Sequence, residues 1–178
     1  MAFGDSLTAG LGVSPEESYP ARLQEKLLLS GYRYRVVNAG VSGDTTAGGV
    51  RRVAWVLKSN PDIVILELGA NDGLRGLSLT ETRANLEQII QRLLAGGAKV
   101  ILAGMKLPPN YGADYTKAFQ TMYADLAKRY DVQFMPFFLD GVAAKADLNQ
   151  ADGIHPTGAG YAVIVGNTWR YVEPLLKR

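Results

Sequence analysis

The sequence predicts an α/β fold, in which one three-layer α/β/α domain spans residues 1–178 around a parallel central sheet of about five strands. The first observation behind this prediction is a set of short apolar runs, such as 63–68 and 100–105, typical of strands covered on both faces. The second is that segments with helical spacing, of roughly ten residues or more, separate these runs and allow right-handed crossovers. A chain of 178 residues with 47% apolar and 20% charged residues is ordinary for a single globular domain.

The expected elements follow from where apolar residues recur and where turn residues interrupt them. Strands are expected at 1–3, 34–37, 63–68, 100–105 and 132–135. Helices are expected at 18–30, 50–57, 78–95, 114–130 and 157–176. The stretches 38–49, 69–76 and 107–113 are predicted to be loops, and 137–156 to be irregular with room for one helical turn.

Local signals support several of these helix ends. Pro20 lies in the first turn of its helix, where a missing N–H is tolerated, and Gly31 ends that helix. Pro61 stops the next helix. Ser78 and Glu81 have the spacing of a capping box, in which each side chain accepts a hydrogen bond from the other residue's backbone N–H. These signals keep the helices separate from the strands and support the alternation.

Composition and charge exclude several classes of protein. The net charge is +2 without a basic run, so no nucleic-acid partner is expected. The chain has no cysteine and one histidine, which excludes disulfides and leaves no ligand cluster for a metal hydrolase. No apolar run reaches the roughly 18 residues that span a membrane, so no integral membrane segment is expected.

The start of the chain is short for a strand. Only three residues precede Gly4, whereas strands typically have about five or six. No signal peptide is recognisable in the sequence. We therefore expect that the chain was trimmed, or that it was expressed without a natural leader.

One serine and the only histidine lie in loops at the edge of the predicted sheet where ligands bind. Ser6 follows the first apolar run, and loops after parallel strands share the rim at which open α/β folds bind ligands. His155 lies in a loop near the other terminus, with Asp152 three residues before it. A serine nucleophile needs a base that takes its proton and an acid that orients and stabilises that base. These three residues are therefore candidates for a serine hydrolase triad.

Four blocks of sequence make this hypothesis more specific. They are Gly4-Asp5-Ser6-Leu7, Gly43 within Val41-Ser42-Gly43-Asp44, Gly69-Ala70-Asn71-Asp72, and Asp152-Gly153-Ile154-His155-Pro156. In kind and in order they resemble the four blocks of the SGNH (GDSL) hydrolase family, over nearly the whole chain. The resemblance implies a flavodoxin-like SGNH hydrolase fold. The stretches 67–76 and 107–112 further resemble the bacterial multifunctional acyl-CoA thioesterase, lysophospholipase and arylesterase branch, which implies a periplasmic or secreted origin.

The resemblance implies a role for each candidate. Ser6 matches the nucleophile, His155 the general base and Asp152 the residue that holds the imidazole. Gly43 through its backbone N–H, Asn71 through its side-chain amide and the Ser6 N–H match the donors of an oxyanion hole. Structural alternatives stay open at the sequence level. Ser6 could be a helix N-cap, His155 and Asp152 a surface histidine beside a capping acid, and Gly43 and Asn71 ordinary turn residues.

Other residues of these loops are assigned more loosely. Asp5, Asp44 and Asp72 are expected to bind backbone N–H groups or to cap helices. Arg75 could meet an anionic leaving group such as a CoA phosphate, or could be a solvated loop arginine. The remaining candidates could line an acyl groove or could pack the loops on each other: Leu74, Leu77, Leu107, Pro108 and Tyr111.

The sequence therefore predicts a serine esterase or thioesterase that hydrolyses short- to medium-chain acyl esters, aryl esters, lysophospholipids or acyl-CoA through an acyl-enzyme. Such a reaction needs no cofactor, no metal and no obligate protein partner, only a small-molecule substrate. One alternative is a carbohydrate O-acetylesterase of the same family, which the apolar stretch 107–109 disfavours. Another is a non-catalytic binding module, which would be expected to lack at least one of Ser6, Asn71, Asp152 and His155.

Overall fold

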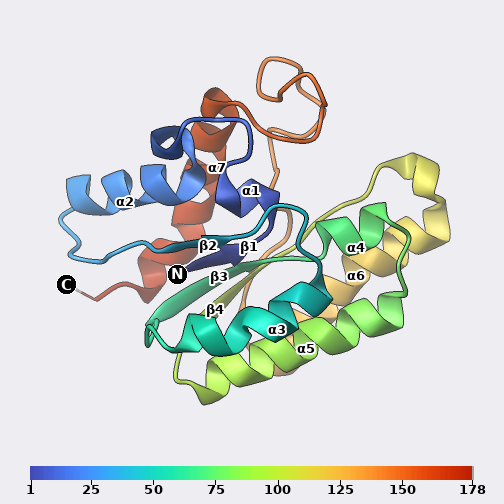
Figure 1. Ribbon diagram of the computed structural model, residues 1–178, viewed down its shortest axis with the longest axis horizontal. Helices are drawn as coiled ribbons and strands as arrows, with labels where there is room; N and C mark the ends of the chain where they lie inside the picture. The colour runs from blue at the N-terminus through green and yellow to red at the C-terminus, as the bar shows by residue number, and fades with distance from the viewer. Residues whose placement is uncertain (178) are drawn as a thin grey trace.

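The computed structural model describes residues 1–177 and consists of a parallel sheet between two layers of helices (Figure 1). Its five strands are β1 (Ala2–Gly4), β2 (Asn38–Gly40), β3 (Ile63–Glu67), β4 (Lys99–Ala103) and β5 (Gln133–Met135). They lie side by side in the order β2-β1-β3-β4-β5. All four neighbouring pairs are parallel, so the five carboxyl ends meet at one edge. The predicted α/β/α architecture is confirmed.

Helices cover both faces of this sheet. The α-helices are α1 (Ser6–Ala9), α2 (Tyr19–Leu29), α3 (Thr46–Leu57), α4 (Ala70–Leu74), α5 (Leu79–Ala95), α6 (Ala113–Tyr130) and α7 (Gly158–Val172). Short 3₁₀ helices are η1 (Pro15–Glu17), η2 (Pro109–Tyr111) and η3 (Glu173–Leu175). Helices α2 and α7 pack on one face of the sheet, and α3, α5 and α6 on the other (Figure 1). No helix within residues 1–177 combines the length and hydropathy needed to cross a membrane.

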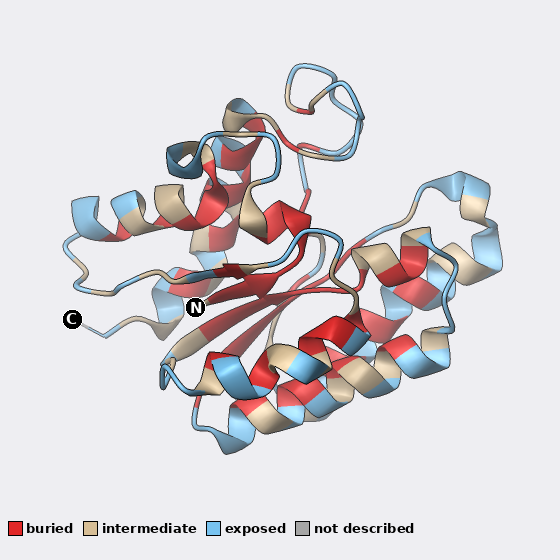
Figure 2. Cartoon of the chain, in the orientation of Figure 1, coloured by how far each residue is buried: buried red, intermediate tan, exposed pale blue. Residues whose placement is uncertain are grey.

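The core lies where the apolar helical stripes meet the sheet. Helix α5 buries Leu86, Ile89, Ile90 and Leu93 completely, at the spacing of one helical face. Strand β3 is buried over its last four residues, and Figure 2 shows the same burial across the neighbouring strands. The outward faces of α5 and α6 are exposed, as expected for helices that cover one side of a sheet (Figure 2).

Residues 34–37 correct one predicted strand. They have no regular structure, and β2 begins instead at Asn38, inside the predicted loop 38–49. The Gln24 side chain satisfies this backbone, because it donates to the Tyr34 carbonyl at 2.9 Å and accepts from the Val36 N–H at 2.7 Å. Only the Val37 carbonyl bonds to the sheet, where it accepts from the Ala2 N–H of β1 at 2.9 Å.

Two predicted loops also contain helices. Helix α3 begins at Thr46, within the predicted loop 38–49, because the Thr45 side chain caps it and accepts from the Gly48 N–H. Helix α4 lies within the predicted loop 69–76 and starts after Gly69, whose φ of +111° suits a glycine. The stretch 137–156 is irregular as predicted, with hydrogen-bonded turns and an isolated bridge between Asn149 and Pro156.

Candidate active site

The turn after β1 places Ser6 at the carboxyl edge of the sheet. Asp5 caps α1, since its Oδ1 accepts from the Leu7 N–H at 3.0 Å, and Ser6 is the first residue of that helix. Asp5, and not Ser6, is therefore the N-cap of α1. A Cβ at Gly4 would collide with the Thr8 Oγ1 and the Glu67 carbonyl, so only glycine allows the strand to turn here. Ser6 is 8% exposed and faces the rim.

Ser6, His155 and Asp152 form a continuous chain of hydrogen bonds. The Ser6 Oγ lies 2.9 Å from His155 Nε2, although 149 residues separate the two. The opposite ring nitrogen, His155 Nδ1, lies 2.7 Å from Asp152 Oδ2. This is the geometry in which an imidazole takes a proton from a serine while a carboxylate holds its other nitrogen. The structure brings together the three residues that the sequence singled out.

The loop that carries His155 is fastened to the loop after α1. The Gln150 amide donates to the Leu11 carbonyl at 2.8 Å and to the Pro156 carbonyl at 2.9 Å. The Gln150 N–H also donates to the His155 carbonyl at 2.8 Å. These bonds hold the two loops together and fix His155 opposite Ser6.

Asp152 is held in its charged form, and its side chain is 46% exposed to water. Its Oδ1 accepts from the His155 N–H at 3.0 Å and from the Ile154 N–H at 2.9 Å. These two backbone bonds, followed by the bond to the imidazole, lower the pKa of Asp152 to about 2. The carboxylate is therefore a permanent charge beside His155 at any pH at which the protein would work.

The predicted oxyanion donors, Gly43 and Asn71, lie in two loops next to the turn that carries Ser6. The Asn71 amide nitrogen donates to the Asp44 carbonyl at 2.9 Å and to Asp5 Oδ2 at 3.2 Å. Gly43 has a φ of +78°, which favours glycine. Within residues 1–177, the backbone N–H groups of Ser6 and Gly43 donate to no protein acceptor. These two groups are free to bind a ligand, whereas both N–H groups of the Asn71 amide are already engaged.

An ion pair between Arg52 and Asp44 stabilises this edge of the sheet. The sequence did not predict it. Arg52 binds Asp44 Oδ2 with Nε at 2.9 Å and Nη2 at 2.7 Å. It also donates to the carbonyl of Ala39 in β2 at 3.1 Å and to that of Gly4, the last residue of β1, at 3.2 Å. Asp44 thus binds a guanidinium in place of the expected backbone N–H groups. Asp72 follows the expectation and accepts from the Thr46 N–H at 2.9 Å.

The two predicted substrate loops lie against each other. The Tyr111 hydroxyl donates to the Leu74 carbonyl at 2.9 Å, and the Leu107 side chain covers Gly73. These contacts support loop packing for Leu107 and Tyr111. Leu77 is different, because 41% of it is exposed. Pro108 is exposed at the start of η2, and Arg75 donates to the Gly43 carbonyl at 3.0 Å.

Three exposed apolar residues of the site loops escaped sequence reasoning. Leu11 is 45% exposed after α1, Val41 is 44% exposed beside the Gly43 turn, and Ile154 is 47% exposed next to His155. With Leu77 they are exposed apolar residues of the loops that carry the triad and the oxyanion donors. The only signal in the sequence was their position, since Val41 and Ile154 lie within the four blocks and Leu11 lies shortly after the first.

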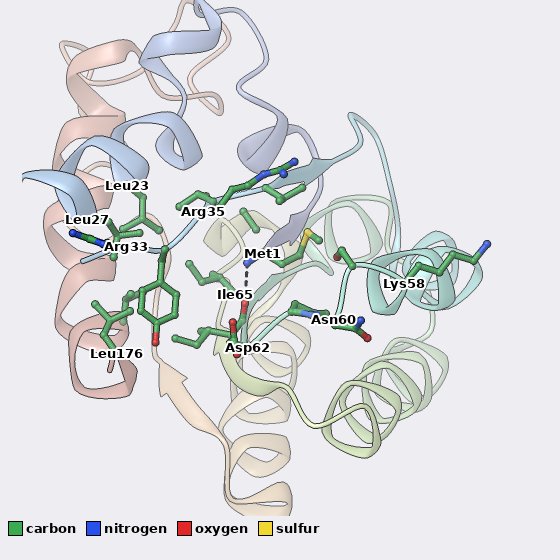
Figure 3. A pocket seen from close by; sticks show the side chains of 18 of the residues that line it. Met1, Leu23, Leu27, Arg33, Arg35, Lys58, Asn60, Asp62, Ile65 and Leu176 are labelled. Atoms are coloured by element: carbon green, nitrogen blue, oxygen red, sulfur yellow. Dashed lines mark hydrogen bonds between the residues drawn. The ribbon is translucent and has the colours of Figure 1, made fainter. Parts of the chain in front are cut away.

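A cavity of about 770 Å³ lies at the other end of the sheet (Figure 3). It is bordered by Met1, by the chain before β2 and by the 58–63 turn before β3, all of which precede strands. The labelled side chains of Arg33, Arg35 and Lys58 lie around it (Figure 3). The amino edge of the strands is far from Ser6, so this cavity is not part of the candidate site.

Comparisons with known proteins agree with this geometry. The model of the GDSL-like lipase/acylhydrolase family matches residues 2–163. The chain is 44% identical to esterase TesA of Pseudomonas aeruginosa over 177 residues, which cover 99% of this chain and 88% of that protein. It is 40% identical to thioesterase 1/protease 1/lysophospholipase L1 of Escherichia coli K12, covering 99% and 84%. The crystal structure of TesA superimposes with a TM-score of 0.95 and 44% identity, over 98% of each chain.

Proposed function

Since the chain belongs to the GDSL-like lipase/acylhydrolase family and is a carboxylic ester hydrolase, we propose that Ser6 is its nucleophile and that it forms an acyl-enzyme. The observation that carries this proposal is the hydrogen-bond chain from the Ser6 Oγ through the His155 imidazole to the Asp152 carboxylate. No other histidine exists in the sequence to serve as the base.

Each step of the reaction has a group to perform it. His155 Nε2 takes the Ser6 proton as the Oγ attacks the acyl carbon, and the charged Asp152 stabilises the imidazolium. The N–H groups of Ser6 and Gly43, joined by Asn71, bind the oxygen that becomes negative. His155 then protonates the leaving alcohol or thiol. A water molecule that gives its proton to the same imidazole releases the acid and restores Ser6.

The rim supports esters and thioesters with an apolar acyl group as substrates. Leu11, Val41, Leu77 and Ile154 are apolar and exposed on the loops around the triad, and apolar side chains at a rim favour an apolar ligand. A guanidinium, that of Arg75, lies beside the Gly43 turn and could meet a phosphate of a CoA or lysophospholipid substrate. The relatives named for thioesterase and lysophospholipase activity fit this range. We also propose a periplasmic or secreted location, which rests on the resemblance to their branch and which cell fractionation would test.

Labelling with a fluorophosphonate probe tests the nucleophile. Wild-type protein should bind one probe at Ser6, and Ser6→Ala should abolish labelling and lower kcat by about 10⁴-fold or more. Ser59→Ala is the matched control, because Ser59 is exposed at the amino edge, and this variant should label like the wild type. Strong labelling of Ser6→Ala would assign the nucleophile to another residue. A panel of acetyl to octanoyl esters tests the substrate, and a strong preference for sugar acetates would favour the carbohydrate O-acetylesterase alternative.

A further inference from the structure

Two carboxyl groups are buried together beneath the nucleophile turn. Glu67 ends β3 with no exposed surface, and Asp5 is 1% exposed. In the sheet, Gly4 lies opposite Glu67, so the residue after Gly4 turns over the Glu67 side chain. The Asp5 N–H lies 3.4 Å from Glu67 Oε2, so the two buried residues are in direct contact. Two carboxylates buried this closely together are not both charged at neutral pH, so the pair holds a proton.

The surroundings place this proton on Glu67. Its Oε2 accepts from the Thr8 hydroxyl at 2.8 Å and more weakly from the Asp5 N–H at 3.4 Å. Its Oε1 accepts from no group within residues 1–177, although an ionised buried carboxylate would need donors there. Burial, and then the charge of Asp5, raise the pKa of Glu67 well above its ordinary value. Burial and the unpaired Oε1 thus favour the neutral form of Glu67.

Asp5 is the better placed of the two to carry the charge. Its Oδ1 accepts from the Leu7 N–H and its Oδ2 from the Asn71 amide. Burial raises the pKa of Asp5 to about 6, so it is ionised at neutral and alkaline pH. The other groups that face the pair are His155 and Asp44 on the side of Asp5, and the buried phenols Tyr19, Tyr123 and Tyr161 on the side of Glu67.

This pair bears on catalysis because Asp5 competes with the oxyanion for Asn71. Both N–H groups of Asn71 are engaged, and the bond to Asp5, at 3.2 Å, is longer than the bond to the Asp44 carbonyl at 2.9 Å. A carboxylate that already accepts a hydrogen bond from a carboxylic acid attracts a further donor less strongly. We propose that Glu67, as a neutral acid, is a positioning residue that donates to Asp5 and thereby lets Asn71 turn one N–H to the oxyanion. This inference rests on the proposed function.

Two substitutions of Glu67 test whether its side chain donates a proton, is charged or only fills space. In Glu67→Gln the amide can accept from Thr8 and donate to Asp5, so kcat for p-nitrophenyl butyrate at pH 8 should stay within about threefold of wild type. In Glu67→Leu the donor is lost and Asp5 should hold Asn71 more tightly. We expect kcat to fall about 10- to 100-fold with KM nearly unchanged, since one oxyanion donor is weakened. Wild-type kcat in Glu67→Leu, or an equal loss in Glu67→Gln, would overturn the proposal.

Infrared spectroscopy of the folded protein reads the proton directly and does not depend on Glu67→Leu being stable. Wild-type protein at pH 8 should show the carbonyl stretch of a protonated carboxylic acid, which Glu67→Gln should lack. Asp72→Asn is the matched control, because Asp72 is a buried acid of the next loop that binds Thr46 and Thr82, and it should keep the band. A wild-type spectrum without the band would overturn the proposal. Failure of the proposed function would appear separately, as fluorophosphonate labelling at a residue other than Ser6.

Discussion

Two acids close to Ser6, Asp152 in the hydrogen-bond chain and Glu67 beneath the turn, have pKa values that their surroundings shift in opposite directions. Asp152 is half-exposed and accepts three N–H bonds, which lower its pKa to about 2. Glu67 is fully buried beside another acid, which raises its pKa well above the ordinary range. The comparison shows that burial decides the form of Glu67, whereas hydrogen bonds from the backbone decide the form of Asp152.

We expect the largest effect on kcat from a substitution that removes the charge of Asp152. Asp152→Asn keeps the size of the side chain but leaves the imidazolium without a counter-charge and with a different hydrogen-bond pattern at Nδ1. We expect kcat to fall by about 10³- to 10⁴-fold, as in other serine triads. Steady-state kinetics with p-nitrophenyl butyrate measure this. A loss below tenfold would mean that Asp152 does no more than shape the loop.

The pH dependence of stability should have opposite signs for two acids of this region. Asp152 has a lowered pKa, so its stabilisation is present above its ordinary value of 3.8 and is lost as the pH falls through about 2. Asp5 has a raised pKa, so its stabilisation is present below 3.8 and is lost as the pH rises through about 6.

Thermal unfolding of two variants measures these signs. The Tm of Asp5→Asn relative to wild type should rise by several degrees from pH 4 to pH 7, at about 2–4 °C per kcal/mol for a chain of this size. The difference between Asp152→Asn and wild type should stay flat over that range. A flat difference for Asp5→Asn would show that Asp5 is charged in the folded protein even at pH 4.

We expect the smallest effect on activity from a substitution of an exposed apolar residue at the rim of the site. Leu77→Ser removes one exposed apolar side chain that could cover about two methylenes of an acyl chain, each worth about 0.8 kcal/mol when fully buried. We expect KM for octanoyl esters to rise about three- to tenfold, while acetyl esters change little. Leu29→Ser, on the exposed side of α2, is the control and should change neither. Equal losses for both chain lengths would place Leu77 in support of the oxyanion hole.

Much of the fold was predictable because local patterns in the sequence determine its helices and strands. Apolar runs such as 63–68 and the stripe of α5 are continuous in sequence, so period and length identify them. The strand at 34–37 was wrong, because Gln24 of the preceding helix takes the backbone bonds of Tyr34 and Val36, and only the Val37 carbonyl bonds to β1. The stretch that does pair, Asn38–Gly40, has the turn-like composition of a loop.

The triad residues were predictable for a different reason. The chain has one histidine, and the four blocks identified its partners before any distance was known. The contacts of Glu67 with Asp5 and of Arg52 with the Gly4 carbonyl join residues 62 and 48 positions apart, so no local pattern shows them. The one available signal was an acid at position 67 within an otherwise apolar strand, and burying an acid is costly unless a partner or a proton compensates.

Trapping the acyl-enzyme tests the central claim, that the chain from Ser6 through His155 to Asp152 activates a serine nucleophile. Wild-type protein mixed with p-nitrophenyl butyrate, quenched in acid and digested, should carry a butyryl group on the peptide that contains Ser6, as found by mass spectrometry. Ser6→Ala should carry none. A butyryl group on another residue, or turnover by Ser6→Ala at the wild-type rate, would contradict the account.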